Sequence, residues 1–413
     1  MLFRSTDMIV GLRCLVCGDE IEISRPCAWH CERSTASDPY HVLEFVDDHA
    51  TPVIAIDPYE QNPFVRYRER MGWWAFARSH GMSDSTTVDI ARSVAGAFAI
   101  TPLQQHQYLS ESLGRMVWAK NETVGVSGSH KSRHLVGIML HLIVAEQLGL
   151  FTKRETLAIS SCGNAALAAA EVAAGQQWPL EVFVPTWMDD AFGRGLDAHG
   201  AKVNRCPRVD GGAGDPAMAA FRDAVRSGAI PFSVQGPANA WCLDGGRTIG
   251  WEIRDQLDAE GVEAQAMYVQ VGGGALASSL ALGLGSDIPL VVVQAEGCAP
   301  LDRALRAATQ VDAPERHWRE IMTPWESPQS VADGILDDET YDWISIAHAL
   351  ERSGGRSVVA AESDIEKAHE MVNAVGPPTS ATGAAGVAGV LTDIDAGRLD
   401  DRPIVVVLSG AAR

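Results

Sequence analysis

The stretch Asn121-Glu-Thr-Val-Gly-Val-Ser-Gly-Ser-His-Lys-Ser-Arg-His-Leu-Val-Gly137 sets one lysine, Lys131, between a Ser/Gly-rich turn and an apolar segment. Ser127, Gly128 and Ser129 are residue types that favour turns and helix N-caps. Apolar residues with helical spacing follow at 135, 138, 139, 142 and 143. We therefore predict that Lys131 lies in the first turn of a helix. Burial and the partial positive charge of unpaired N–H groups there disfavour an ammonium, which leaves an amine able to attack an aldehyde. On this stretch alone, the alternative is a surface lysine near a helix start.

Length and composition predict a globular protein of two domains. The chain has 413 residues, of which 46% are hydrophobic and 21% charged. Its 33 basic and 53 acidic residues give a net charge of −20, which argues against nucleic-acid binding. We found no apolar run long enough to cross a membrane and no signal-peptide core at the start of the sequence. We therefore expect a cytoplasmic protein with no membrane or nucleic-acid partner.

Four of the eight cysteines are crowded near the start of the chain, at Cys14, Cys17, Cys27 and Cys31. Two thiolate pairs on adjacent turns can close a tetrahedral zinc ribbon. The second pair has three intervening residues instead of two, and His30 in place of Cys31 would restore the shorter spacing. We predict a structural zinc site formed by the four cysteines. The alternative is a vestigial ribbon with reduced, free cysteines.

Helical and strand patterns alternate from residue 133 to 300, which is typical of α/β proteins with a parallel sheet and crossover helices. In such sheets ligands bind at the carboxyl ends of the strands. Four junctions of this kind carry unusual chemistry. They are the turn before Lys131, the loop from Ser160 to Asn164, the glycine run from Gly272 to Leu276, and Ser409 after the last strand.

Each junction matches one part of a ligand. Lys131 is an amine nucleophile, and consecutive N–H groups in the loop from Ser160 suit a carboxylate. The glycine run allows backbone N–H groups to approach a phosphate, although it fits neither the Rossmann nor the Walker pattern. Ser409 can bond a heterocyclic nitrogen. Taken singly, these junctions would be an ordinary N-cap turn, a flexible loop and an exposed serine, but together they predict a pyridoxal phosphate site.

The chain resembles the fold-type II pyridoxal-phosphate enzymes, the superfamily of threonine synthase, serine/threonine dehydratase and the tryptophan synthase β subunit, and most closely threonine synthases. The resemblance covers nearly the whole chain. Its motifs are Cys14-x2-Cys17-Gly, Thr101-Pro-Leu103, Ser129-His-Lys131, Ser161-Cys-Gly-Asn164, Gly245-Gly-Arg-Thr-Ile-Gly-Trp-Glu-Ile253, Gly272 to Leu276, Ala332-Asp-Gly-Ile335, Thr382-Gly-Ala-Ala385 and Ser409-Gly410.

The resemblance implies a role for each site residue. Lys131 would form a Schiff base with the cofactor and later remove the substrate α-proton, and Asn164 would bond the 3′-oxygen. Ser409 would face the pyridine nitrogen. The phosphate would be held by Gly272, Gly273, Gly274, Ala275 and Leu276. The substrate carboxylate would be bound by Ser160, Ser161, Cys162 and Gly163.

The resemblance also implies two open parallel-sheet domains and a homodimer. A zinc-ribbon-like segment would span residues 1–40, the large domain 41–130 with 245–413, and the smaller domain 131–244. His130 departs from threonine synthases and dehydratases, which usually have Phe before the lysine, and resembles the tryptophan synthase β pattern instead.

The activity implied is that of a lyase acting on an amino acid with a β or γ leaving group. The resemblance favours a threonine synthase-like reaction. The alternatives are a serine/threonine ammonia-lyase and a β-replacement synthase. Lys120, Arg133 and Arg247 are candidates to bind a substrate phosphate. A non-catalytic relative that binds the cofactor or a metabolite is the alternative of another class.

Overall fold

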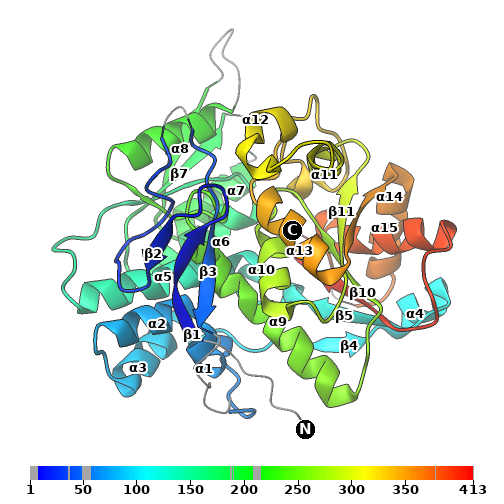
Figure 1. The fold of residues 1–413 in the computed structure, drawn as a ribbon, viewed down its shortest axis with the longest axis horizontal. Helices are drawn as coiled ribbons and strands as arrows, with labels where there is room; N and C mark the ends of the chain where they lie inside the picture. The colour runs from blue at the N-terminus through cyan, green and yellow to red at the C-terminus, as the bar shows by residue number, and fades with distance from the viewer. Residues whose placement is uncertain are drawn as a thin grey trace.

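The computed structural model describes residues 8–35, 38–48, 57–186, 188, 190–207, 215–376 and 378–412. The larger of two parallel sheets has the strand order β12-β11-β10-β13-β5-β4 (Figure 1). All neighbours are parallel except β4, which is antiparallel to β5 at the edge. The strands are β4 (Leu103–Gln105), β5 (Val117–Asn121), β10 (Ala266–Gln270), β11 (Leu290–Ala295), β12 (Arg356–Ala360) and β13 (Ile404–Leu408).

Helices cover both faces of this sheet, because successive side chains of a strand point to opposite faces. In β10, Met267 and Val269 belong to the core formed with α9 (Trp241–Glu260), α10 (Ala275–Leu284) and α13 (Trp343–Ser353). Tyr268 belongs to the opposite core, formed with α4 (Gln107–Leu113), α14 (Glu362–Asn373) and α15 (Ala381–Asp395). A sheet buried on both faces explains why its strands are almost continuously apolar.

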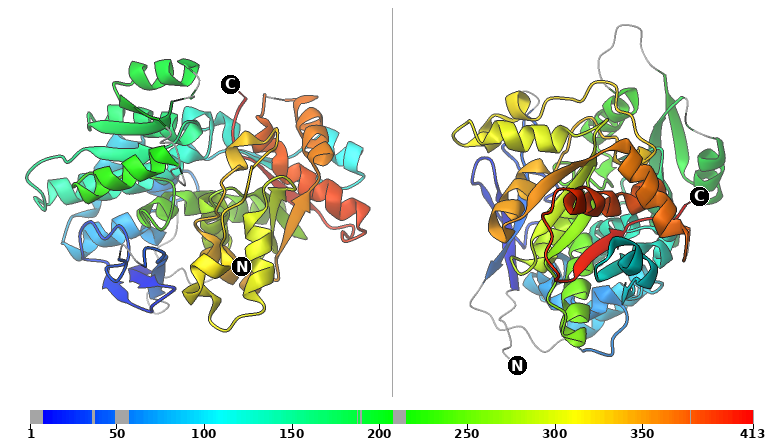
Figure 2. Two further views of the ribbon diagram at one scale, coloured as in Figure 1. Left: turned by 90° about the horizontal axis from the view of Figure 1, so that it is seen from above. Right: turned by 90° about the vertical axis from the view of Figure 1, so that its right-hand side faces the viewer.

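A second, four-stranded parallel sheet has the order β8-β7-β6-β9. Its strands are β6 (Leu157–Ser160), β7 (Leu180–Pro185), β8 (Lys202–Cys206) and β9 (Ile230–Pro231), and its helices are α6 (Asn164–Gly175), α7 (Asp190–Ala198) and α8 (Pro216–Arg226). Figure 2 shows this region in green beside the orange and red strands and helices of the larger sheet. The prediction of an α/β fold with two parallel sheets is confirmed.

The helix that begins at the lysine, α5 (Lys131–Gln147), packs against both α6 and α9 and so joins the two sheet regions. Glycines allow α5 and α9 to approach closely. A Cβ atom on Gly245 would lie 1.9 Å from the Arg133 carbonyl oxygen, and one on Gly137 would lie 2.7 Å from the Gly245 nitrogen. No side chain fits there, so Gly245 is required by packing.

The N-terminal region is a three-stranded antiparallel sheet of β1 (Met8–Cys14), β2 (Glu20–Glu22) and β3 (Leu43–Asp48). It is the dark blue sheet of Figure 1. Because β3 pairs with β1, this sheet continues past the boundary expected at residue 40. The helices α1 (Pro63–Arg66), α2 (Gly72–Ser79) and α3 (Asp84–Ala95) follow, and α2 and α3 contact α5. Among the described residues of the segment 41–130, only β4 and β5 join the larger sheet. Residues 1–7 and 49–56 lie outside the described part.

The described helices include none that is both long and apolar enough to span a bilayer.

The glycine contact gives a first prediction. Gly245→Ala should lower the free energy of unfolding by about 1–3 kcal/mol or more, because the added methyl group overlaps the α5 backbone. The measurement is denaturant unfolding. Gly175→Ala in α6 is the matched control, because a Cβ atom there meets nothing within 4 Å. An equal effect of both substitutions would contradict the close helix contact.

Candidate active site

Lys131 is the first residue of α5, as the sequence predicted. The helix start has no side-chain cap hydrogen bond, and its N-cap position is His130. The expected serine cap is therefore wrong: Ser132 Oγ donates to the carbonyl of Val126 at 2.7 Å, and the buried Ser129 hydroxyl has no partner among the described residues. The first turn of α5 can therefore accept an external anion or dipole.

The turn before Lys131 lies against the end of β13. The backbone N–H and the ring Nδ1 of His130 both bond the Ser409 carbonyl oxygen, at 3.1 and 3.0 Å. Ser129 and Gly410 form an isolated antiparallel bridge. Asn164 Nδ2 would lie 3.4 Å from a Cβ atom on Gly410, so α6 also reaches this point. The structure thus brings the neighbours of Lys131 together with Ser409 and Asn164.

The glycine run from Gly272 to Leu276 connects β10 to the start of α10. It packs against the segment from Asp337 to Asp342, whose Asp342 N–H donates to the Gly273 carbonyl oxygen at 3.0 Å. A Cβ atom on Gly272 would lie 2.4 Å from Asp337 Oδ2, and one on Gly274 would lie 3.0 Å from Asp342 Cβ. Side chains at these glycines would fill the space that the two carboxylates occupy.

These two carboxylates connect the glycine run electrostatically to the lysine. Burial lowers the pKa of Lys131, and the charges of Asp337 and Asp342 oppose that shift. Burial also raises the pKa of Asp342 to about 7. The two negative charges therefore do not fully offset the effect of burial on the pKa of Lys131, and the amine is shifted toward its nucleophilic form.

Two buried histidines flank Lys131, and both are neutral at pH 7. Burial lowers the pKa of His130 well below its usual value and that of His134 to about 3. Nδ1 of His134 bonds the carbonyl oxygen of Cys242 at 2.9 Å. A carbonyl oxygen only accepts, so Nδ1 carries the proton in both rings. Nε2 of both rings has no partner among the described residues.

The predicted carboxylate loop follows β6. Its Ser161 N–H donates to the Phe183 carbonyl oxygen, and its Gly163 N–H donates to Ser161 Oγ, both at 3.3 Å. Cys162 is exposed. Asn164 begins α6, and its Oδ1 is buried without a partner among the described residues. Binding of a substrate carboxylate by residues 160–163 stays a prediction.

The three cations proposed for a substrate phosphate are held in buried ion pairs. Lys120 Nζ lies 2.6 Å from Glu252 Oε2. Arg133 pairs with Glu122 at 2.9 Å and with Glu252 at 2.5 Å. Arg247 pairs with Asp244. Their charges are neutralised by protein carboxylates, so they are not available to a phosphate.

A group of metal-binding residue types lies in the N-terminal region, distinct from the Lys131 site. The ligand atoms of Cys14, Cys17, Cys31 and His41 all lie within 4.8 Å of one another. Cys14 Sγ lies 3.2 Å from His41 Nδ1, and Cys17 Sγ lies 3.6 Å from Cys31 Sγ. His41 Nε2 contacts Asp38 Oδ2 at 3.3 Å. Three thiols and an imidazole are a donor set that fits zinc, and a carboxylate behind the histidine is common at such sites.

Cys27, the fourth ligand expected from the sequence, is not a member of this group. Its backbone is in the left-handed region, with φ 57°, and its N–H donates to His141 Nε2 at 3.1 Å. This bond ties Cys27 to α5, whereas the segment leading into β3 brings in His41. The expectation of His30 as an alternative ligand is likewise not met, because His30 is outside the group.

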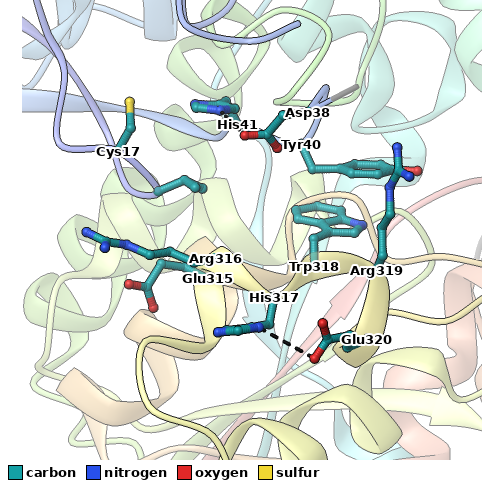
Figure 3. A pocket seen from close by; sticks show the side chains of 11 residues that line it. Cys17, Asp38, Tyr40, His41, Glu315, Arg316, His317, Trp318, Arg319 and Glu320 are labelled. Carbon is teal, nitrogen blue, oxygen red and sulfur yellow. Dashed lines mark hydrogen bonds and ion pairs between the residues drawn. The ribbon is translucent and has the colours of Figure 1, made fainter. Parts of the chain in front are cut away.

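A cleft of about 510 Å³ lies beside this group (Figure 3). It separates the N-terminal region from η4 (Pro314–Arg316) and α12 (Trp318–Ile321), and Tyr40 stacks on Trp318 across it at 4.7 Å. Cys17 and His41 are among its lining residues, and Lys131, Asn164 and Ser409 are not. The cleft is therefore separate from the site around Lys131.

The residues around Lys131 fit a polar, phosphorylated cofactor with an aldehyde. Buried polar atoms without a partner among the described residues are Ser129 Oγ, His130 Nε2, Asn164 Oδ1, Gln270 Oε1 and Asp342 Oδ1. Such atoms are rare in a folded protein unless a ligand or water pairs with them. Together with the low-pKa lysine and the glycine run, they define a cofactor site in a protein of two parallel sheets.

Comparison with known proteins identifies the class. Residues 94–410 match the family described as pyridoxal-phosphate dependent enzyme, and the chain belongs to this family. It is 28% identical to a threonine synthase from Methanosarcina acetivorans, over 75% of this chain and 74% of the relative. It is also 28% identical to a serine dehydratase-like protein from Mus musculus, over 52% of this chain and 62% of the relative. The solved structure of a threonine deaminase from T.th. has TM-score 0.61 and 23% identity, covering 80% of this chain and 98% of that one.

Sequence reasoning missed three residues that the structure brings to these sites. Gln270 is a polar residue at the end of an apolar strand, two residues before the glycine run, which was a usable signal. Asp342 lies in a segment whose pattern was hard to interpret. His41 is ten residues beyond Cys31, and nothing in the local spacing connects the two.

The raised pKa of Asp342 gives a second prediction. Its folded pKa lies above that of an unfolded aspartate, so the folded state binds this proton more tightly and loses stability as the pH rises. Asp342→Asn should therefore stabilise the cofactor-free protein relative to wild type, by a margin that grows between about pH 4 and pH 7 to roughly 4 kcal/mol. The measurement is denaturant unfolding across this range. Asp312→Asn at an exposed position is the control, and a pH-independent margin at 342 would contradict the raised pKa.

Proposed function

We propose that this protein is a pyridoxal-phosphate lyase that removes a β or γ leaving group from an amino acid. The observation that carries the proposal is the position of Lys131, at an uncapped helix start beside Ser409. Asp337 and Asp342, which lie against the glycine run, also act on Lys131 through their charges. The threonine synthase and serine dehydratase-like relatives support this reaction class.

The bound cofactor would supply an electron-withdrawing ring that weakens the bond to the substrate α-proton. Lys131 Nζ is the amine that would attach the cofactor and then accept that proton, and its lowered pKa favours both roles. The Gly272–Leu276 N–H groups would hold the phosphate, and Asn164 would bond the 3′-oxygen. Ser160, Ser161, Cys162 and Gly163 would orient the substrate carboxylate.

Of the possible substrates, a hydroxyamino acid without a phosphate has the better support, as in a serine/threonine ammonia-lyase. The three candidate cations are neutralised by buried carboxylates. In addition, burial raises the pKa of the Cys162 thiol of the substrate loop, and the negative charges of Asp215, Asp333 and Asp337 raise it further. Acidic surroundings would repel a phosphorylated side chain.

A threonine synthase-like reaction on a phosphorylated substrate is the second candidate. The relative from Methanosarcina acetivorans, which matches three quarters of the chain, favours it.

A third prediction tests the lysine. Lys131→Ala should abolish the visible absorption band of the protein–cofactor complex and lower keto-acid release by about 10²–10⁴-fold, because both the attachment point and the base are lost. Lys153→Ala, at an exposed position, is the matched control. The measurement combines absorbance with keto-acid release from serine, threonine, O-phosphohomoserine and β-substituted alanines.

The same panel distinguishes the candidates. Keto acid formed without an added nucleophile supports the ammonia-lyase, phosphate release with threonine formation supports the synthase, and product that requires an added nucleophile supports a β-replacement synthase. Cofactor binding without turnover of any substrate would contradict the lyase and favour a non-catalytic relative.

We also propose that Cys14, Cys17, Cys31 and His41 bind a structural zinc ion, with Asp38 orienting the histidine. Four protein ligands leave no open position, so the metal would stabilise the N-terminal sheet and would not take part in the reaction.

A fourth prediction follows from this ligand set. Cys31→Ser and His41→Ala should each reduce bound zinc from about one ion per chain to a small fraction. Cys27→Ser should retain it, because Cys27 lies outside the group. Elemental analysis by mass spectrometry is the measurement. Loss of zinc in Cys27→Ser with retention in His41→Ala would contradict this ligand set and support the four-cysteine site expected from the sequence.

The homodimer and the cytoplasmic location stay predictions. Light scattering on the purified protein and fractionation of cells are the measurements that check them.

A further inference from the structure

Gln270 makes a contact at the cofactor site that gives it a role beyond packing. It is the last residue of β10 and lies on the same face as Tyr268, toward α15. Its amide Nε2 donates to Ser409 Oγ at 2.5 Å and to the Gly383 carbonyl oxygen at 3.1 Å. Gln270 and Ser409 are only 4% and 3% exposed, so neither amide hydrogen is shared with bulk water.

The Gly383 carbonyl determines which way this amide faces. A carbonyl oxygen only accepts hydrogen bonds, so the amide nitrogen must lie toward it. In the flipped orientation Gln270 Oε1 would lie against the Gly383 carbonyl oxygen, which has no hydrogen to donate, and the Gly383 contact would be lost. Ser409 Oγ therefore receives an N–H and cannot direct its own hydrogen to Gln270.

The backbone of Ser409 is fixed on both sides. Its N–H donates to the Gly383 oxygen at 3.2 Å, and its carbonyl oxygen accepts from His130. The side chain therefore cannot escape Gln270 by a shift of the main chain. Among the described residues no acceptor takes the hydroxyl hydrogen of Ser409, so it is left for a ligand.

We propose that Gln270 is a positioning residue that makes the Ser409 hydroxyl a hydrogen-bond donor to the ring nitrogen of the bound cofactor and so keeps that nitrogen unprotonated. The inference rests on the proposed role of Ser409 opposite the ring nitrogen. A protonated ring nitrogen would have to donate to Ser409 Oγ, and the buried hydroxyl hydrogen would then have no acceptor, which is unfavourable.

The consequence concerns the choice of reaction. A neutral pyridine withdraws electrons less strongly than a pyridinium. It therefore disfavours the side reaction in which the substrate's amino group stays on the cofactor, giving pyridoxamine phosphate and a keto acid. Gln270 would in this way favour loss of the leaving group without taking part in it.

The direct test is the ¹⁵N chemical shift of the ring nitrogen in holoenzyme loaded with ¹⁵N-labelled pyridoxal phosphate. Wild type should give the resonance of an unprotonated pyridine at neutral pH. Gln270→Glu should shift it toward the pyridinium position, because a carboxylate accepts the Ser409 hydrogen and leaves Oγ as an acceptor for the ring. Gln310→Glu, the same change at an exposed position, is the control and should leave the resonance unchanged.

Gln270→Leu provides a second variant that adds no charge. It frees Ser409 Oγ to donate or accept, so the resonance should move between the two limits with pH. Pyridoxamine phosphate formed per turnover should rise about tenfold in Gln270→Glu, the effect of one hydrogen bond to a charged group. A protonated ring nitrogen in wild type, or identical shifts in wild type and both variants, would overturn the proposal.

The ¹⁵N shift does not depend on turnover, so the two proposals can fail separately. An unprotonated ring nitrogen that responds to Gln270 in a protein without lyase activity would leave this inference intact and reject the proposed reaction. Normal lyase activity with a ring nitrogen indifferent to Gln270 would do the reverse.

Discussion

The structure depends on one buried guanidinium, that of Arg133. Its side chain is only 2% exposed and pairs with Glu122 and Glu252, neither of which is exposed at all. These carboxylates raise the pKa of Arg133 although burial opposes them. Buried charges are costly unless they are paired, so removing any member would leave an uncompensated charge in the core. The network therefore holds the start of α5, and with it Lys131 two residues away, against α9 and the segment that directly follows β5.

Burial also determines the chemistry next to this network. The same low-polarity surroundings lower the pKa of Lys131, keep His130 neutral and raise the pKa of Asp342. These shifts have one cause and act in one direction, toward neutral groups. The site thus contains a nucleophilic amine without a full counter-charge, and several of its buried polar atoms have no partner among the described residues. Such perturbed groups are typical of catalytic sites.

Prediction from sequence succeeded where a property repeats along the chain. Apolar periodicity predicted the alternation of helices and strands between residues 133 and 300, although the short strand β9 was missed, and turn chemistry predicted the helix start at Lys131. The junctions after β6, β10 and β13 were found because ligands bind at the carboxyl ends of parallel strands, and this holds for both sheets. Spacing rules were less successful: they grouped Cys27 with three other cysteines, whereas the fold brings His41 to that position from the segment that leads into β3. Phosphate binding by Lys120 or Arg133 failed for a related reason, since Glu252, the carboxylate that pairs with both, lies 132 and 119 residues away in the sequence.

The sequence by itself determined the α/β class, the family resemblance and the residues that end the strands, because all of these depend on local patterns and on short motifs. Only the tertiary structure decided how those residues are paired. It assigned the carboxylates to the buried cations, turned the Gln270 amide toward Ser409, and exchanged Cys27 for His41 beside the other thiols. Hydrogen bonds and ion pairs depend on distances of about 3 Å between groups that are far apart in the chain, and no one-dimensional pattern contains those distances.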